Sequence, residues 1–175
     1  MTGDRGQRAG FSRFATVLGT VVALALMPAA GFAQDLGIEV GSTAPAAKVF
    51  TLDGKEANLS QYIGKTVVIM EFWATWCPNC KELEPTLVAA VKKYGAQVKF
   101  VGVAVSVNES PDKVKLFVEK HGLPGEHVFD TKGEATGAYD VPATSYVVVI
   151  NKAGKVVYTG LGGKQDLDAA IKKAL

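Results

Sequence analysis

Hydrophobic and polar residues follow patterns along this chain that predict alternating strands and helices. Three nearly continuous apolar runs, at 66–73, 98–105 and 145–150, are rich in β-branched residues. Such runs are typical of strands that are buried on both faces of a sheet. The sequence therefore predicts a central sheet whose core strands are covered on either side.

Two longer helices are predicted after the first two of these strands. The segment 78–94 places its apolar residues on one helical face, and Pro85 within it is expected to kink the helix. The segment 111–121 follows Ser110, a residue type that caps helices, and it starts with a proline. Gly122 supplies the signal that ends it.

Shorter elements complete the pattern. The segments 48–52 and 55–59 are predicted to form a hairpin, because the Asp-Gly between them supplies the positive φ of a tight turn. The others are a short strand at 127–130, a short helix at 133–139, a strand at 155–159 after a turn at 152–154, and an amphipathic helix at 165–175. This order predicts an α/β fold, with a mixed sheet and helices on both faces.

The first 33 residues have the features of a secretory signal peptide. A basic start precedes an apolar run at 14–27, and the small residues Gly31 and Ala33 fit a cleavage site after Ala33. The alternative is an uncleaved anchor over 14–32, which is barely long enough for a bilayer of about 30 Å. Both alternatives place the remaining chain outside the cytosol, and we expect that compartment to be a bacterial periplasm.

The remaining chain is expected to comprise a lead-in segment at 34–47 and one α/β domain at 48–175. Beyond residue 33, 16 lysines balance 16 acidic residues, so this part lacks the basic surface with which proteins bind nucleic acids. No nucleic-acid partner is therefore expected. The presence of two cysteines excludes a disulfide-rich mini-protein and a four-cysteine zinc site.

The candidate chemistry lies at Cys77 and Cys80, between a predicted strand and a predicted helix. Unpaired N–H groups and the helix dipole stabilise a thiolate at a helix start, so Cys77 is the expected nucleophile. Cys80 lies one turn further along, where we expect it to be the more shielded, resolving thiol. The pair predicts thiol–disulfide exchange, with its own disulfide as the redox group and no further cofactor.

Two other interpretations of the cysteine pair stay open. The pair could be a permanent structural disulfide, although a loop this short gains little entropy from a crosslink. It could instead bind copper or zinc together with a histidine. Only His121 and His127 are available, and nothing in the sequence brings either one to the cysteines. No metal site is therefore expected.

The segment Phe72-Trp-Ala-Thr-Trp-Cys-Pro-Asn-Cys80, with Pro85, resembles the active-site segment of the thioredoxin superfamily. Further motifs resemble extracytoplasmic TlpA/ResA-like thiol–disulfide oxidoreductases: Phe50-Thr-Leu-Asp-Gly, Leu59-Ser, Gly64-Lys and a long insertion at 106–139. The resemblance implies a thioredoxin fold with an N-terminal β-hairpin and a central insertion. It also implies a periplasmic reductant, of a kind that often serves cytochrome c maturation.

The residues around the two cysteines are candidates for contact with the substrate. Trp76 is expected to shape the surface that the substrate meets. Pro78 and Asn79 lie between the cysteines, and this dipeptide is expected to contact the substrate and to tune the reduction potential.

Two acidic residues are candidates for modulating the cysteines. The thioredoxin family has a carboxylate at the position of Glu71, behind the second cysteine. Burial would raise its pKa, and Glu71 would then relay the proton of Cys80. TlpA/ResA-like proteins place a glutamate where this chain has Leu83, whereas Glu84 follows one residue later. Glu71 and Glu84 together are similar to the acid pair in the C-terminal reductase domain of DsbD-type proteins. Glu84 is equally explained as a solvated helix charge.

A cis-proline normally faces the two cysteines in thioredoxin-like proteins. Alignment on Tyr139 and on the turn at 151–154 places Ser145 in that position, whereas aligning Pro142 requires three extra residues. Thr144 and Ser145 are therefore candidate substrate contacts, and the peptide bond at Ser145 is expected to be trans.

Taken together, these features predict a periplasmic thiol–disulfide oxidoreductase that reduces disulfides in exported, cysteine-containing proteins. A reductant outside the cytosol needs an electron source, and we expect a membrane thiol donor. The chain itself would meet the membrane only if its N-terminal segment is not cleaved. Two alternatives stay open: an oxidant or isomerase that donates disulfides, and a copper-binding chaperone.

Overall fold

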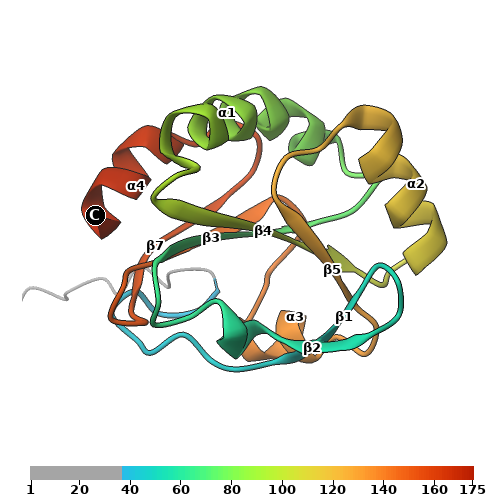
Figure 1. Ribbon diagram of the computed structural model, residues 1–175, viewed down its shortest axis with the longest axis horizontal. Helices are drawn as coiled ribbons and strands as arrows, with labels where there is room; N and C mark the ends of the chain where they lie inside the picture. Colours follow the sequence, from blue (N-terminus) through green and yellow to red (C-terminus); the bar gives the residue numbers. More distant parts are fainter. Residues whose placement is uncertain (1–36) are drawn as a thin grey trace, which may run out of the picture. The chain divides into compact units, whose positions relative to one another are not determined.

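The computed structural model describes residues 37–175, and their central feature is one sheet with helices packed against it (Figure 1). The predicted signal peptide at 1–33 lies outside the described residues. Among residues 37–175, no helix has the length and apolar character needed to cross a membrane.

The elements follow the predicted order closely. In chain order they are β1 (Lys48–Thr51), β2 (Glu56–Asn58), η1 (Leu59–Gln61), β3 (Val67–Trp73), α1 (Pro78–Tyr94), β4 (Val98–Val105), α2 (Pro111–His121), β5 (Glu126–Asp130), α3 (Glu134–Ala138), β6 (Tyr146–Ile150), β7 (Val156–Leu161) and α4 (Leu167–Ala174). The predicted hairpin is present as β1 and β2, which pair in antiparallel fashion from Lys48 opposite Asn58.

The seven strands form a mixed sheet in the order β2-β1-β5-β4-β3-β6-β7. β3 pairs in parallel with β4 and in antiparallel fashion with β6, so it has a hydrogen-bonded neighbour on each edge. Its Val-Val-Ile-Met start is fully buried, as expected for a strand covered on both faces. The end of β3 thus lies at the centre of the domain, and it leads directly into the two cysteines.

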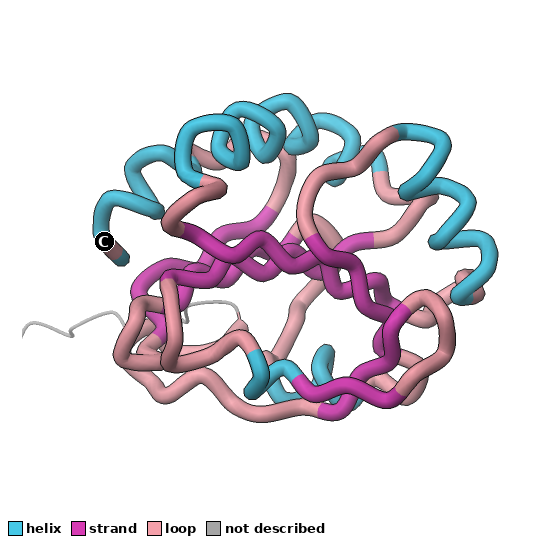
Figure 2. Tube along the Cα trace, in the orientation of Figure 1, coloured by secondary structure: helices cyan, strands magenta, loops and turns pink. Residues whose placement is uncertain are grey.

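Helices cover both faces of the sheet, as predicted (Figures 1 and 2). The helices α1, α2 and α4 lie on one face, and the short α3 lies on the other. Leu83 and Ala90 of α1 pack with Ile171 of α4 against Ile69 of β3, in an entirely apolar cluster. The expected mixed α/β sheet with helices on both faces is therefore confirmed.

Local sequence signals set the limits of α2. The Ser110 side chain accepts a hydrogen bond from the Lys113 N–H, which caps the start of the helix. Gly122 follows the last turn in the left-handed conformation, at φ 61° and ψ 38°. A residue with a side chain is disfavoured there, which explains why the helix ends at a glycine.

The segment before β1 is packed along the domain. The backbone of Ile38 donates to Tyr139, Gly41 donates to Val156, and Thr43 forms an isolated bridge with Lys155. Ile38 and Ala44 are both buried in the core. These contacts tie residues 38–44 to the end of α3 and to the turn before β7.

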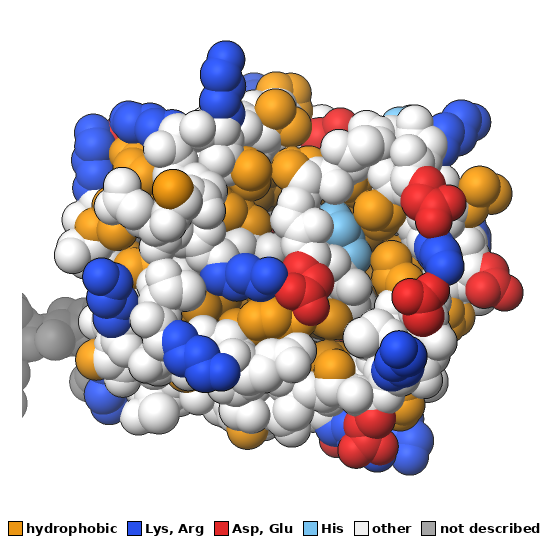
Figure 3. All heavy atoms as spheres, viewed as in Figure 1, with side chains coloured by type: hydrophobic (Ala, Val, Ile, Leu, Met, Phe, Trp, Pro, Cys, Tyr) orange, Lys and Arg blue, Asp and Glu red, His pale blue; other side chains and the backbone are white. Residues whose placement is uncertain are grey.

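Positively and negatively charged side chains are mixed on the surface. On the face shown in Figure 3, lysine and acidic side chains are interspersed. Several form ion pairs at exposed positions, for example Lys48 with Glu56 and Lys99 with Glu126. Such a surface matches the neutral charge balance of the sequence beyond residue 33.

Candidate active site

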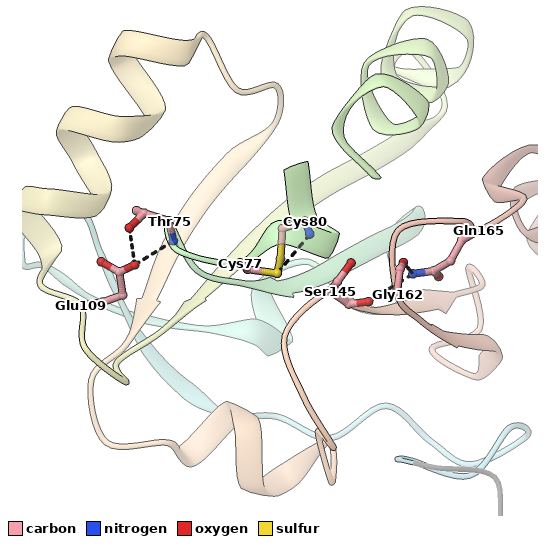
Figure 4. The surroundings of a disulfide bond; sticks show 7 residues. All are labelled: Thr75, Cys77, Cys80, Glu109, Ser145, Gly162 and Gln165. Atoms are coloured by element: carbon pink, nitrogen blue, oxygen red, sulfur yellow. Dashed lines mark hydrogen bonds between the residues drawn. A yellow bond between two sulfur atoms is a disulfide. The ribbon is translucent and has the colours of Figure 1, made fainter. Parts of the chain in front are cut away.

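The two cysteines lie where β3 gives way to α1, and they form a disulfide (Figure 4). Cys77 is the N-cap of α1, and its Sγ accepts the N–H of Cys80 at 3.1 Å. Pro78 takes the first helical position, where its fixed φ suits the helix and its missing N–H costs nothing. The strand–turn–helix context predicted for the motif is therefore present.

The surroundings of Cys77 favour a thiolate once the disulfide is reduced. The first turn of α1 contains no acidic residue, so nothing there opposes the positive end of the helix dipole. The N–H of Cys80 already points at the Cys77 sulfur. Both features stabilise negative charge on this atom.

Exposure within the motif alternates. Cys77 is 1% exposed and Cys80 is 8% exposed, so the prediction that Cys80 is the more shielded of the two is wrong. As the N-cap, Cys77 turns its side chain inward over the first turn of α1, and both cysteines join the main hydrophobic cluster. Trp76, Pro78 and Asn79 are exposed instead. They are the part of the motif that is open to solvent.

Hydrogen bonds from the loop after β4 hold the active-site turn. The Glu109 Oε1 accepts both the backbone N–H of Thr75, at 2.7 Å, and its hydroxyl, at 2.5 Å. The Trp76 indole N–H donates to the Val107 carbonyl at 2.9 Å. Lys113 neutralises Glu109 through a 3.0 Å ion pair with Oε2. Sequence reasoning missed Glu109, because no local pattern distinguishes it from a solvated acid.

Glu71 occupies the predicted position behind the second cysteine. A small cavity of about 40 Å³ is lined by Glu71 together with Cys80 and Glu84. The Glu71 Oε1 is buried and has no hydrogen-bond partner. Burial, with a smaller contribution from the charge of Glu84, raises the pKa of Glu71 from its ordinary value of 4.5 to about 8.

Glu84 is half-buried, and it faces the same cavity as Glu71. Its charge acts on Glu71 because the two carboxyl groups share that space. The structure therefore brings together the two acids that sequence analysis singled out, and it brings them to Cys80.

His127 also lines the cavity that contains Cys80, which the sequence gave no reason to expect. The other histidine, His121, lies exposed at the end of α2 and stacks on Phe117. Within residues 37–175, no group of three or more His, Cys, Asp or Glu side chains is arranged to hold a metal ion.

Ser145 lies in the surroundings of the disulfide, directly before β6 (Figure 4). Its N–H donates to the Phe72 carbonyl at 2.8 Å, and its own carbonyl accepts the N–H of Gly162. Its φ is 64°, which is uncommon for a residue other than glycine. The peptide bonds of residues 37–175 are all trans, and Pro142 is exposed in the preceding loop.

A larger groove of about 660 Å³ opens beside Trp76. Its lining is mainly apolar, and it includes Val105 and Val107 from the end of β4 and the loop after it. Thr144, a predicted substrate contact, lines the groove from the opposite loop. The other lining residues are Ser106, Gly133, Thr136, Gly137, Asp140, Val141 and Ala143.

The sequence of this chain matches a known protein family and named relatives. The Redoxin family matches residues 39–175. The thiol-disulfide oxidoreductase ResA of Geobacillus thermodenitrificans is 34% identical over 163 residues, covering 86% of this chain and 91% of the relative. ResA of Bacillus subtilis is 36% identical over 126 residues, covering 72% of this chain and 69% of the relative.

A solved structure gives the same picture of the fold. The thiol:disulfide interchange protein of the thioredoxin family from Chlorobium tepidum superposes with a TM-score of 0.65 at 28% identity. The match covers 78% of this chain and 97% of that protein. The expected thioredoxin fold is confirmed, as is the resemblance to TlpA/ResA-like proteins.

Proposed function

We propose that this chain, which belongs to the Redoxin family and is a thiol–disulfide oxidoreductase, reduces disulfides in exported proteins. The observation that carries the proposal is the Cys77–Cys80 pair at the start of α1, with Cys80 on the cavity that holds Glu71. One cysteine is placed to hold negative charge, and the other is placed beside a group that can take its proton.

The first step is attack on the substrate. In the reduced protein the Cys77 thiolate attacks one sulfur of a substrate disulfide. A bond forms between Cys77 and that sulfur while the substrate's own S–S bond breaks. The departing substrate sulfur leaves as a thiolate and takes a proton from solvent. The N-terminus of α1 stabilises the thiolate before the attack.

The second step releases the substrate. Cys80 transfers its proton to Glu71 and attacks the Cys77 sulfur, which breaks the bond to the substrate and closes the Cys77–Cys80 disulfide. The substrate gains two electrons in total, and the protein returns to the oxidised state seen in the structure. A pKa of about 8 suits Glu71 to this exchange, since thiols titrate in the same range.

The groove beside Trp76 is the proposed contact for the substrate chain. Trp76 is 45% exposed and Val107 is 60% exposed, so large apolar side chains are open to solvent next to the cysteines. Thr144 and the polypeptide before β6 form the other side. An extended segment around the substrate's cysteine would bury these side chains on binding.

The proposed compartment is the periplasm, which rests on the signal-peptide pattern of residues 1–33. Outside the cytosol the Cys77–Cys80 disulfide must be reduced again after each turnover, and a membrane thiol donor is the proposed electron source. The resemblance to TlpA/ResA-like proteins makes cytochrome c maturation the proposed setting, with apocytochrome cysteines as substrates.

Trapping in cells tests this proposal. In the full chain carrying Cys80→Ser, Cys77 can attack but the mixed disulfide cannot be resolved, so exported cysteine proteins should accumulate as adducts. The matched Cys77→Ser chain should trap none. Equal capture by both variants, or adducts formed only with cytosolic proteins, would overturn the proposal.

A further inference from the structure

Three neighbouring strands place Glu71 and His127 in one row. Glu71 of β3 is paired with Gly102 of β4, and Gly102 is paired with His127 of β5. Directly paired residues project from the same face of a sheet. Glu71 and His127 therefore stand on the face that α1 covers, roughly 10 Å apart at the backbone with only a glycine between them.

Gly102 leaves the room that the His127 ring occupies. A Cβ at this position would lie 2.4 Å from the His127 Nδ1 and 2.6 Å from its Cε1. The backbone of Gly102 does not need a glycine, because its φ is outside the left-handed region. The absence of a side chain thus lets the imidazole lean over β4, toward Glu71.

The space between the two side chains is hollow. The cavity of about 40 Å³ is lined by Glu71, His127 and Cys80, and a second void of about 20 Å³ is lined by Glu71, Gly102 and His127. About 10–15 Å³ is enough for one water molecule. The exposed side chain of Lys81 also lines the first cavity, so one end of it reaches the surface.

Polar atoms in this space lack partners. The Glu71 Oε1 and both ring nitrogens of His127 are buried without a hydrogen bond, as is the indole nitrogen of Trp73, which packs edge-on against the His127 ring. Buried polar groups are rarely left in this state, and a bridging water needs two to four such partners. These atoms supply them.

We propose that His127 is a positioning residue for proton transfer at Cys80: it and Glu71 form a water-bridged carboxyl–imidazole pair across Gly102. This inference rests on the thiol–disulfide exchange described above. When Cys80 attacks Cys77, its proton moves to the Glu71 carboxylate. Neutral His127 holds the bridging water through a ring nitrogen, and the protonated carboxyl releases its proton through this water to solvent along the cavity. The departing substrate thiolate takes up a proton from solvent, which balances the proton that Cys80 loses.

The electrostatic surroundings fit this sequence. Burial lowers the pKa of His127, so the ring is neutral at pH 7 and has a nitrogen able to accept a hydrogen bond from the bridging water. The backbone carbonyls of Pro124 and Leu123 oppose this shift, because they favour the protonated ring.

The other titratable groups facing the pair come from α1. They are Cys80, Lys81 and Glu84. β4 contributes only Gly102 to this row, and α2 and the loop after it contribute the apolar Phe117, Leu123 and Pro124. Within residues 37–175 no further acid or base lines the cavity, and Glu71 is the acid that stands in one strand row with His127.

Proton NMR of the full chain tests the pair directly. The chain has two histidines, so His121→Gln assigns the ring signals by a change at an exposed residue that does not itself line the cavity. In the oxidised wild type, the His127 ring signals should shift with an inflection at the titration of Glu71, near pH 8. In Glu71→Gln this inflection should vanish. Identical His127 titration curves in the two proteins would overturn the inference.

A kinetic experiment tests the consequence for Cys80. Reduced protein mixed with an aromatic disulfide releases one coloured thiolate as Cys77 attacks and a second as Cys80 resolves the mixed disulfide. In His127→Gln, the second phase at pH 7 should slow by about tenfold, less than the loss of a direct acid–base group, and its pH profile should shift. His121→Gln should match the wild type in both phases.

Gly102→Ala provides a second variant that keeps the imidazole. Its Cβ would displace the ring, so it should slow the same phase as His127→Gln does. A wild-type second phase in both variants would overturn the inference. Absence of the first phase in the wild type would instead contradict thiol–disulfide exchange itself, so the two failures are distinguishable.

Discussion

Thr75 gives both of its hydrogen-bond donors to one oxygen of Glu109, 34 residues further along the chain. This contact links the loop between β4 and α2 to the turn that carries the cysteines. The Glu109 side chain is fully buried, and its second oxygen is ion-paired with Lys113. The position of Trp76 and Cys77 thus depends on a carboxylate outside the sequence motif.

Removal of this carboxylate should loosen the active-site turn. Glu109→Ala leaves the N–H and hydroxyl of Thr75 unpaired, and we expect a loss of about 2–3 kcal/mol in the free energy of unfolding. Urea denaturation of the oxidised protein measures it. Glu119→Gln, at an exposed position of α2, is the matched control and should change stability by less than about 0.5 kcal/mol. Equal stability of both variants would contradict the proposed clamp.

Glu71 should make stability depend on pH. Its pKa is 4.5 when exposed and about 8 in the fold, so the folded state binds the proton more tightly than the unfolded state. The stabilisation is complete below pH 4.5 and is lost as pH rises toward 8, by up to about 1.4 kcal/mol per pH unit. Denaturant titrations of wild type and Glu71→Gln across this range measure it.

As the pH rises, the free energy of unfolding of Glu71→Gln should increase relative to that of the wild type. If the free energies of unfolding of the two proteins changed in parallel with pH, Glu71 would have an ordinary pKa, which would contradict this prediction. The disulfide-bonded form is the appropriate sample, because its cysteines do not titrate.

Replacement of Ser145 by glycine should stabilise the protein, whereas replacement by proline should destabilise it. Its φ of 64° costs a serine roughly 1–2 kcal/mol, so Ser145→Gly should raise the free energy of unfolding by about 1 kcal/mol. Ser145→Pro loses the hydrogen bond to Phe72 and cannot adopt this φ, so it should destabilise by more than about 1 kcal/mol. Thermal unfolding of the three proteins compares them. A proline variant as stable as the wild type would show that this loop readily adopts the cis-proline geometry of related proteins.

The limits of α1 and β4 agree with the ranges predicted from the sequence, 78–94 and 98–105. Those limits depend on local signals: apolar periodicity, the proline after Cys77 and β-branched runs. The location of Cys77 and Cys80 between a strand and a helix was likewise predictable from local signals, whereas the location of Glu71 behind Cys80 was implied by the resemblance to the thioredoxin family.

The contacts that sequence analysis missed all depend on tertiary packing. Glu109 reaches Thr75 across 34 positions, and His127 lines the same cavity as Glu71 only because three strands are in register. Gly102 was the available signal, since a glycine inside an apolar strand indicates a close approach by another group. The relative exposure of Cys77 and Cys80 was predicted wrongly, because the capping role of Cys77 turns it inward.

The reduction potential of the Cys77–Cys80 pair tests the central claim most directly. The full chain would be equilibrated in glutathione buffers, and the reduced fraction would be read by thiol trapping. We expect a potential below about −230 mV, in the range of proteins that act as reductants. A potential above about −160 mV would contradict the account, and it would identify the protein as a disulfide donor or isomerase.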